Sequence, residues 1–572
     1  MSKDNKIFEL PTGWAWSILG DITLKVTDGS HNPPNKEVFG IPMLSAKNIN
    51  NGNIDFNNGV RYITEEAFHQ ENERTNIEAG DVLLTIVASI GRSAIVPEII
   101  KEKFTIQRSV ALVKPCVIPG KYLMYAFQAP FFQKIMEHEA KGTAQKGVYL
   151  GTLKSLPIPI PPLNEQYQIV EKLEEIFSEI QEANQSLEKA KKILSVYEYV
   201  VLKLAFEGEL TKEWRNENHP NSAFQFLSDL AVERKSKYDM AVSRKTKVKS
   251  KDFNYDFDFS AHKEINSWAV AKLDKLIYIA ARVGWKGLKR EEYTSSGPLF
   301  LSVHSLNHGK TVKFDEAFNI SEDRYAESPE IMLTLNDILL CKDGAGIGKV
   351  SIVKHLPTKA TINSSLLIVR GGTAFDPDFL YYLFKGPEMQ RLVNDRISGS
   401  SIPHLFQKDI KEFILNVPSI EEQKQIVQEI ESRFTVIENL QNAISENRSR
   451  SEILKQVVLN NAFSGKLTKQ DNTNEIGSDL LDKIKEEKKK YLKNQKELAK
   501  SNPKTIRVME EKKSIIQVLE SSVAPLSAKE VWLQSKHKDD IESFYSELRE
   551  IQDKIIEIKK DTESLLSLRH EN

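Results

Sequence analysis

Apolar residues recur three and four positions apart through a stretch of more than 40 residues, and this stretch occurs twice in the chain. Between residues 163 and 206 the recurring apolar positions are Val170, Leu173, Phe177, Ile180, Leu187, Leu194, Val201 and Ala205. The corresponding positions 257 residues later include Val427, Ile430, Phe434, Ile437 and Ile444. The spacing predicts two long helices with one apolar stripe each, about 60 Å long at 1.5 Å per residue. Helices of that length need a partner, so a two-helix coiled coil is predicted.

The two helical stretches are copies of one sequence. Leu163–Lys212 and Ile420–Lys469 align without a gap and share 17 of 50 residues. We assign spacer helices to residues 161–215 and 418–470. Two positions of the stripe are polar in both copies, and such residues fix the register of a coiled coil at a cost in stability; they are Asn184 with Gln441, and Lys191 with Arg448.

The ends of these helices carry their own signals. Ser419, followed three residues later by Glu422, predicts a capping box at the start of the second helix. Gly208 and Gly465 stand where the two helices should stop, so they are expected to be C-cap glycines.

Residues 1–160 and 263–417 predict two related mixed α/β domains. Apolar, β-branched runs bounded by turn residues, such as Asp81–Val87 and Val110–Val113, predict buried strands. Short blocks of the first domain recur in the second, but the two diverge near residues 28–40 and 284–297. An aromatic-rich helix is expected over Lys121–His138. The domains therefore share a scaffold and differ in their loops, which suits one task performed on two targets.

Two further segments complete the chain. Residues 216–262 predict a basic linker, in which Arg234–Lys251 contains eight lysines or arginines; it is either a solvated connector or a phosphate contact. Residues 475–572 predict an unrepeated helical extension, charged from Asp479 to Lys500 and amphipathic from Ile541 to Leu565.

Composition narrows the function. The net charge is −1, so any nucleic-acid contact must come from local basic surfaces. There is no apolar run of 18 residues, and Met1–Lys6 does not begin a signal peptide, so a cytoplasmic protein is expected. The two cysteines have no metal-ligand spacing, and the 11 histidines are scattered, so no metal site is assigned.

Two stretches resemble catalytic motifs and depart from them. Asn32-Pro33-Pro34 is followed by Asn35, where a methyltransferase motif needs an aromatic residue to stack on a flipped base. Gly344–Lys349 lacks the spacing of a phosphate loop, and Val350 stands where Ser or Thr is required. No catalytic residue is assigned to the chain.

Basic and amide side chains beside turns are the candidates for DNA contact. Arginine and lysine recognise guanine in the major groove, and asparagine and glutamine recognise adenine. Any one of them could equally be a surface or scaffold residue, including Gln107 and Asn363, which match between the domains. The candidates are His31, Lys47, Asn48, Arg92, Gln107 and Arg108 in the first domain, and Trp285, Lys286, His304, Lys342, Lys349 and Asn363 in the second.

Both helices begin with Pro-x-x-x-Glu-Gln-x-Gln-Ile-Val and end with Ala-Phe-x-Gly-x-Leu-Thr. With these motifs, and with its order of domain, helix, domain, helix, the chain closely resembles the DNA-specificity subunits of type I restriction–modification systems over about residues 10–470. The resemblance implies two target recognition domains, each reading half of a split, asymmetric site on double-stranded DNA. It also implies an antiparallel helix pair that sets the gap between the half-sites.

The resemblance further implies that this chain has no catalysis and no cofactor of its own. Partner modification subunits would bind S-adenosylmethionine and methylate adenine, and a motor–nuclease subunit would use ATP and Mg²⁺. A coiled-coil interaction scaffold, or a fused methyltransferase or endonuclease component, remains the alternative.

Overall fold

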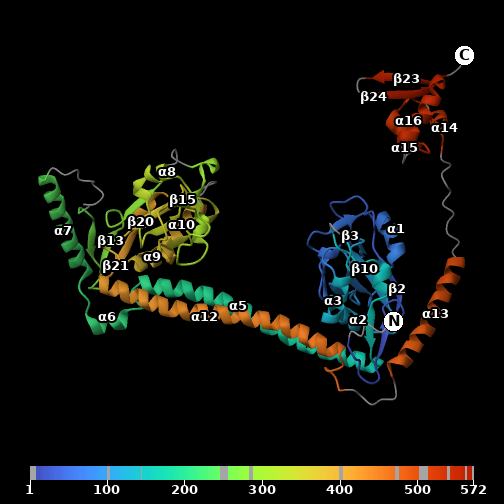
Figure 1. Cartoon of the computed structure of the whole chain (residues 1–572), viewed down its shortest axis with the longest axis horizontal. Helices are drawn as coiled ribbons and strands as arrows, with labels where there is room; N and C mark the ends of the chain where they lie inside the picture. The colour runs from blue at the N-terminus through green and yellow to red at the C-terminus, as the bar shows by residue number, and fades with distance from the viewer. Residues whose placement is uncertain are drawn as a thin grey trace. The chain divides into compact units, whose positions relative to one another are not determined.

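The computed structural model describes residues 8–99, 103–142, 145–244, 255–282, 288–398, 404–469, 476–501, 513–522, 524–537, 541–560 and 563–569. The chain divides into two compact units, one made of residues 1–176 with 455–572 and the other of residues 177–454. Figure 1 shows the elements of each unit. No helix in these described ranges is long and apolar enough to span a membrane.

The first α/β domain is built on a four-stranded antiparallel sheet in the order β2-β10-β7-β8. Its strands are β2 (Thr23–Asp28), β7 (Val82–Thr85), β8 (Ser93–Ile95) and β10 (Val110–Pro115). Every residue of β7 is buried, as its continuous apolar sequence predicts. The strands predicted over Asp81–Val87 and Val110–Val113 are thus confirmed.

Smaller sheets and helices surround this sheet. A second sheet has the order β6-β3-β9, and β1 pairs with β11. The bounds are β1 (Ala15–Ile18), β3 (Ile41–Leu44), β4 (Ile49–Asn50), β5 (Asn53–Ile54), β6 (Arg61–Ile63), β9 (Thr105–Ile106), β11 (Pro157–Ile160), α1 (Glu65–Thr75) and α4 (Leu150–Lys154). The single helix expected over Lys121–His138 is wrong: it is two helices, α2 (Gly120–Gln128) and α3 (Pro130–Glu139). Pro130 starts α3 because its ring and missing N–H do not fit the interior of a helix.

The second α/β domain repeats the two main sheets of the first, but β4 and β5 have no counterpart among its described residues. Its sheets have the orders β14-β20-β17-β18 and β16-β15-β19. The bounds are β13 (Ala269–Lys272), β14 (Tyr278–Ala281), β15 (Thr294–Leu301), β16 (Phe318–Asn319), β17 (Ile338–Cys341), β18 (Val350–Ile352), β19 (Ala360–Ile362), β20 (Leu366–Arg370), β21 (Ile414–Val417), α8 (Glu322–Ala326), α9 (Pro377–Lys385), α10 (Pro387–Ser398) and α11 (Gln407–Lys411). One strand, β12 (Phe259–Ala261), is added beside β13.

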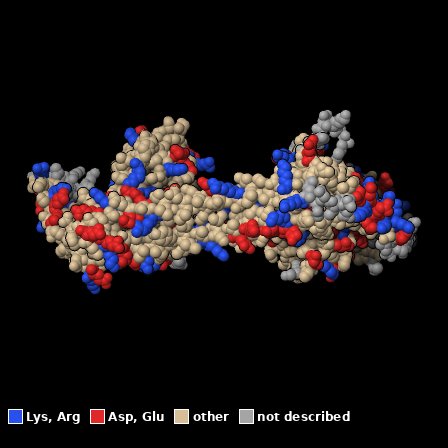
Figure 2. All heavy atoms as spheres, turned by 90° about the horizontal axis from the view of Figure 1, so that it is seen from below, with Lys and Arg blue, Asp and Glu red and all other residues tan. Residues whose placement is uncertain are grey.

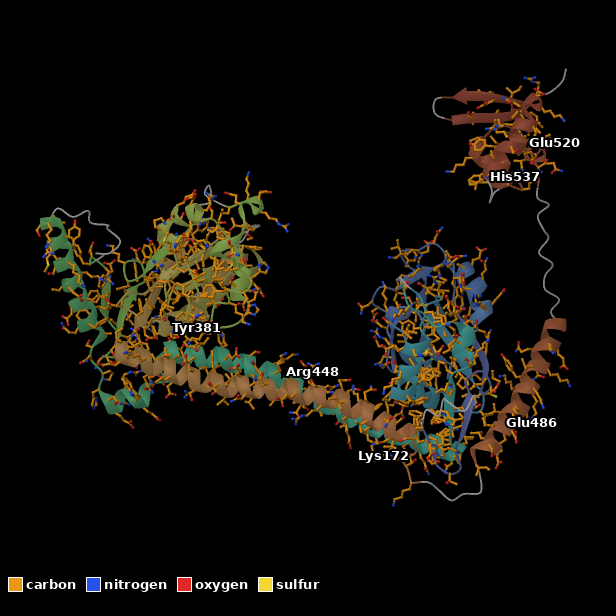
Figure 3. All side chains as sticks on the ribbon, in the orientation of Figure 1. Lys172, Tyr381, Arg448, Glu486, Glu520 and His537 are labelled. Carbon is orange, nitrogen blue, oxygen red and sulfur yellow. The ribbon has the colours of Figure 1, made fainter. Side chains whose placement is uncertain are left out.

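The two predicted long helices are α5 (Leu163–Phe206) and α12 (Ile420–Phe463). Within residues 177–454, Glu188 contacts Arg448 and Glu198 contacts Gln441, so residue numbers rise on one helix as they fall on the other. The pair is therefore antiparallel. Figure 3 labels Arg448 where α5 runs alongside α12. The predicted fold class, two mixed α/β domains with an antiparallel helix pair, is confirmed.

Glycines end both long helices as predicted. Gly208 has a φ of 80° and Gly465 a φ of 72°. In each case the next residue donates its N–H to the carbonyl five residues back, at 3.0 Å from Glu209 to Leu204 and 2.8 Å from Lys466 to Asn461. Only one of the two hydrogen bonds of the predicted capping box forms at Ser419. The N–H of Glu422 donates to the Ser419 hydroxyl, but its carboxylate binds other residues, described below.

The segment predicted as a basic linker is largely helical. It contains α6 (Lys212–Asn218) and α7 (Ala223–Ser243), and Ala223, Leu227 and Leu230 of α7 are buried. Four of the eight lysines and arginines of the basic run, from Lys245 to Lys251, lie outside the described residues. A phosphate contact there stays a prediction.

The extension after residue 475 begins with a repeat of α7. Helix α13 (Gly477–Ser501) donates its first N–H to the carbonyl of Gly13, just before Trp14. Helix α7 makes the same bond from Ala223 to Ser267, just before Trp268. This part of the extension is therefore repeated, contrary to the prediction.

The last segment is not purely helical. It contains α14 (Ile515–Glu520), α15 (Ala528–Gln534) and α16 (Ile541–Glu550), with a sheet in the order β22-β24-β23. The strands are β22 (Leu526–Ser527), β23 (Ile555–Lys560) and β24 (Glu563–Leu568). The helix expected from Ile541 to Leu565 ends at Glu550. The β-branched run Ile555–Ile558 favours a strand instead.

Candidate nucleic-acid interface

Three pairs of candidate residues fall at equivalent structural positions in the two domains. In the first domain, Gln107 follows β9 and donates its N–H to the carbonyl of Leu44 at 2.8 Å. In the second, Asn363 follows β19 and makes the matching bond to Leu301 at 2.9 Å. The backbone of both residues therefore serves the scaffold. The side chain of Asn363 accepts a bond from the Ser365 N–H at 3.1 Å.

Arg92 and Lys349 occupy one turn that is built twice. Each follows a glycine with positive φ, 89° at Gly91 and 84° at Gly348. Each glycine carbonyl accepts a bond from a glutamine on the neighbouring helix, Gln133 or Gln390. Both cations are exposed. Lys349 Nζ donates to Asn307 Oδ1 at 2.7 Å.

Lys47 and His304 form a third matched pair. Lys47 lies on the short helix Ala46–Asn48, and His304 on the short helix Val303–Leu306. The neighbouring candidate Asn48 is fully buried, and its amide donates to the carbonyls of Asp55 and Asn58. That side chain holds the loop together and is not free to read a base.

Two candidates contact the carboxylate of an aspartate. His31 Nε2 lies 2.8 Å from Asp28 Oδ2, and Asp28 also binds Arg74. Lys342 Nζ lies 2.8 Å from Asp343, which also contacts His404. Arg74, Asp343 and His404 had no distinguishing pattern in the sequence, so only the fold could reveal them. Arg108 is exposed, while Trp285 and Lys286 lie outside the described residues.

On the face shown in Figure 2, lysine and arginine are interleaved with aspartate and glutamate. That face therefore carries no single basic patch.

The four register residues differ in environment. Asn184 and Gln441 are partly buried between the helices, whereas Lys191 and Arg448 are exposed. Gln441 Nε2 donates to Glu198 at 3.1 Å across the pair. Their role in fixing the register stays a prediction.

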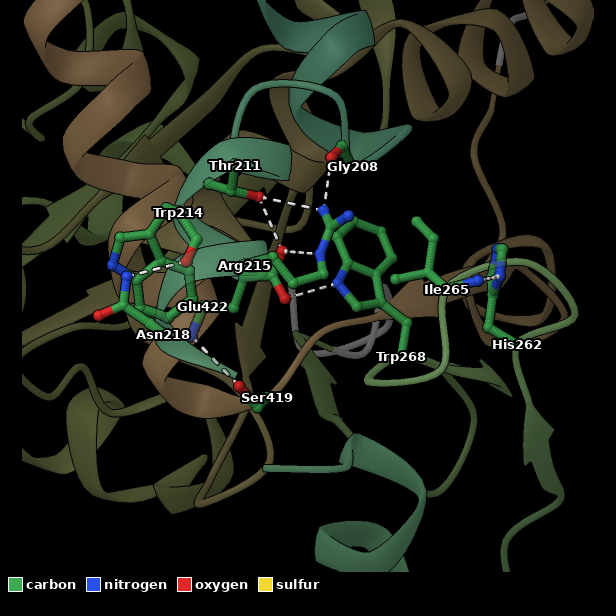
Figure 4. A network of polar contacts seen from close by, with 10 residues as sticks. All are labelled: Gly208, Thr211, Trp214, Arg215, Asn218, His262, Ile265, Trp268, Ser419 and Glu422. Carbon is green, nitrogen blue, oxygen red and sulfur yellow. Dashed lines mark hydrogen bonds and ion pairs between the residues drawn. The ribbon is translucent and has the colours of Figure 1, made fainter. Parts of the chain in front are cut away.

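A buried glutamate joins the second α/β domain to the helix pair (Figure 4). Trp268 Nε1 donates to Glu422 Oε2 at 2.8 Å, and Thr211, beyond the end of α5, donates to Oε1 at 2.7 Å. Arg215 Nε lies 2.8 Å from the same oxygen, and the Glu422 side chain is fully buried. We call this arrangement the Glu422 latch.

The first domain repeats this arrangement as the Glu165 latch. Trp14 Nε1 donates to Glu165 Oε2 at 2.9 Å, and Thr468, beyond the end of α12, donates to Oε1 at 3.1 Å. Burial raises the pKa of Glu165, although these two hydrogen bonds lower it. Among the described residues no cation pairs with Glu165. The repeated Glu-Gln motif and the repeated tryptophans were the sequence signals for both latches.

This architecture defines a class of protein in which an α/β domain occurs twice and is attached to a pair of long helices. The chain belongs to the type I restriction modification DNA specificity family, whose domain model matches residues 11–192 and 292–449.

Individual relatives agree with this membership. The EcoBI specificity subunit of Escherichia coli is 31% identical over 252 residues, which cover 42% of this chain and 52% of that protein. The EcoKI specificity subunit of E. coli K12 is 22% identical over 507 residues, covering 84% of this chain and 96% of that protein. A solved chain from a type I restriction–modification system is similar with a TM-score of 0.55 and 17% identity, over 80% of this chain and 100% of that one. This last likeness concerns the fold.

Proposed function

We propose that this chain is the specificity subunit that reads a bipartite, asymmetric site on double-stranded DNA. Each recognition domain would read one half-site. The observation that carries the proposal is one scaffold built twice, with the same strand order and different loop residues. Partner subunits would supply adenine methylation and restriction, with S-adenosylmethionine, ATP and Mg²⁺ bound to them rather than to this chain.

The matched pairs support two different half-sites. Arg92 is replaced by Lys349, Lys47 by His304, and Gln107 by Asn363. Arginine and lysine can both bind guanine, and glutamine and asparagine can both bind adenine, but arginine is a planar fork where lysine is a point charge, and asparagine is shorter than glutamine. The same backbone positions therefore offer different hydrogen-bonding groups in the two domains.

DNA selection tests the proposal directly. The chain would be assembled with its modification subunits, incubated with random duplexes, and the bound DNA sequenced. We expect enrichment of two short motifs separated by a fixed, unspecified gap. Enrichment of a single motif, or of none, would contradict the proposal.

A repeated apolar surface supports a partner that binds twice. Val196 is 62% exposed and its counterpart Ile453 is 64% exposed; Tyr197 is 43% exposed and its counterpart Leu454 is 47% exposed. We name these the Val196 patch on α5 and the Ile453 patch on α12. Exposed apolar residues that recur at both copies of a repeat suit two copies of the same partner. A modification subunit is the proposed occupant.

Serine variants of each patch test this assignment. We expect Val196→Ser with Tyr197→Ser to leave one modification subunit bound, and the same change at Ile453 and Leu454 to do likewise. The four changes together should leave none, as measured by mass photometry of the assembled complex. Tyr199→Ser is the matched control, because Tyr199 is 55% exposed on the same helix but its counterpart is the polar Gln456. Unchanged stoichiometry in the fourfold variant would rule the patches out.

A further inference from the structure

Both recognition domains contain the same bulge, at which one of two paired strands carries extra residues. In the first domain Tyr62 lies opposite both Glu37 and Pro42. In the second, Asn319 lies opposite both Thr294 and Leu299. The residues of the two bulges correspond at an offset of 257 positions: Glu37 to Thr294, Pro42 to Leu299 and Tyr62 to Asn319. The residues between them leave the ladder at Val38–Gly40 and at Ser295–Gly297.

A glycine makes each bulge possible. Gly40 has a φ of 146° and Gly297 a φ of 130°. A Cβ at either position would lie 2.4 Å from a carbonyl oxygen, that of Ile63 or that of Ile320. Only glycine fits so close an approach in that conformation. The backbone of the bulge is thus conserved between the two domains of this chain.

The two residues at the apex are not the same in the two domains. Val38 is 89% exposed and Phe39 is 84% exposed. Their counterparts are Ser295 and Ser296, which are also exposed. An exposed phenylalanine beside an exposed valine is an interaction feature, because neither gains stability from the fold.

The base of the first bulge is held in place. The Glu37 N–H donates to the Tyr62 carbonyl at 2.9 Å, and Arg61 Nη1 donates to the Pro34 carbonyl at 2.7 Å. Pro33 and Pro34 restrict the approaching chain. Val38 and Phe39 are therefore presented on a restrained support, so little conformational entropy is lost when they bind.

The difference between the domains indicates which ligand the bulge meets. A protein partner that binds twice needs equal surfaces, as the Val196 and Ile453 patches provide. The half-sites of an asymmetric DNA site are the ligands that differ between the domains. The loop that carries the bulge also begins at the strand end that holds the candidates Gln107 and Arg108. The Ser30 N–H donates to the Ile106 carbonyl at 2.9 Å, and the Arg108 N–H donates to the Ser30 carbonyl at 2.8 Å.

We propose that Val38 and Phe39 form an apolar wedge that contacts the bases of the first DNA half-site and unstacks one base step. The inference rests on the proposed function. Apolar side chains between base steps partly unstack them and kink the duplex, and an aromatic ring can stack on a base. Ser295 and Ser296 offer only hydroxyl groups, so the second half-site is bound without a wedge. The two halves of the site therefore differ in the deformation they must allow.

Exchanging the apex residues between the domains tests the wedge. The variant Val38→Ser with Phe39→Ser gives the first bulge the apex of the second, without touching the core. The assembled complex is bound to its selected site, with 2-aminopurine placed in turn at each step of both half-sites. We expect fluorescence enhancement at one step of the first half-site only, and its loss in the variant. Affinity should fall roughly tenfold, in line with one lost base–aromatic stack. The slope of affinity against salt should stay constant, because no phosphate contact is removed.

Three controls separate the outcomes. Ile99→Ser removes another exposed apolar residue of the same domain, 78% exposed, and should change nothing. Phe39→Leu keeps an apolar wedge and should retain most of the signal. Ser295→Val with Ser296→Phe should create an enhancement in the second half-site.

The readout also separates this inference from the proposed function. If the unmodified complex selects no bipartite site, the proposed function fails. If it selects one but the serine variant shows the same fluorescence and affinity, the wedge alone is wrong. If the variant instead loses a modification subunit, the bulge is a protein contact and the wedge is overturned.

Discussion

At the scale of single residues, the two latches use one design in two electrostatic settings. Glu422 and Glu165 each accept a hydrogen bond from a tryptophan of the preceding domain and one from a threonine. Only Glu422 has a described cationic partner, Arg215 at 2.8 Å. A buried carboxylate without a cation carries a desolvation cost that its hydrogen bonds only partly offset.

This difference predicts opposite responses to neutralisation. Burial raises the pKa of Glu165 above its ordinary value of 4.5, so the folded state holds this proton more tightly than the unfolded state. The stability contributed by Glu165 is therefore full below pH 4.5 and is lost as the pH rises through the raised pKa. Glutamine cannot ionise, so Glu165→Gln does not lose this stability. As the pH rises from 4.5 through the raised pKa of Glu165, the unfolding temperature of the natural chain should therefore fall relative to that of the variant. Calorimetry at a series of pH values measures the difference.

Glu422→Gln is the matched comparison. It leaves the largely buried Arg215 side chain without its carboxylate, so the unfolding free energy at neutral pH should drop by about 3 kcal/mol. If the two glutamine variants behave alike at every pH, the cation does not distinguish the latches.

Sequence patterns located the latches only in part. The motif marked Glu165 and Glu422 as repeated, and the tryptophans were matched, but nothing in the sequence joined them. Their contacts span 151 and 154 residues. Likewise Asn48 carries the amide that suits adenine, and only the fold shows that this amide is used up by Asp55 and Asn58. Residue type indicates chemistry, while burial decides whether that chemistry is available.

At the scale of elements, strong periodicity was a reliable signal and charge was a misleading one. The apolar stripes of α5 and α12 were predicted because apolar residues recur at regular spacing along helices that are each 44 residues long. Helix α7 was missed because lysines and arginines hide a short stripe of Ala223, Leu227 and Leu230. The hairpin β23–β24 was missed because a run of alternating apolar residues at the end of an amphipathic helix carries no clear boundary.

The apolar stripe of α5 contains a polar residue, Asn184, whose contribution to stability can be tested. Asn184 Oδ1 is buried and has no hydrogen-bond partner among the described residues. Replacing it with leucine should raise the unfolding free energy by about 1 kcal/mol, because a buried unsatisfied acceptor is removed and apolar contact is added. Guanidinium unfolding followed by circular dichroism gives the value. Gln185→Leu, on the exposed neighbouring position, should have no such effect. A loss of stability in Asn184→Leu would mean that the amide has a role in pairing.

At the scale of the whole molecule, the proposed function makes the helix pair a spacer between the two recognition domains. Inserting seven residues into α5 alone would move the end of the helix by about 10 Å. The Thr211 and Arg215 contacts to Glu422, at 2.7 and 2.8 Å, cannot survive that displacement. We expect such a single insertion to abolish DNA selection and to lower the unfolding midpoint.

Matched insertions in α5 and α12 restore the pairing and should change the DNA site instead. Seven residues in each helix add about 10 Å, which corresponds to about three base pairs. The gap in the selected site should lengthen by that amount while both half-sites keep their sequences. Three base pairs also turn the duplex by about 100°, whereas a heptad turns the helix by only about 20°, so binding should weaken. Three matched heptads add about 31 Å, close to one turn of DNA, and should recover most of the affinity. Random-duplex selection with each variant measures the gap, and a gap that stays constant would show that the helices do not set it.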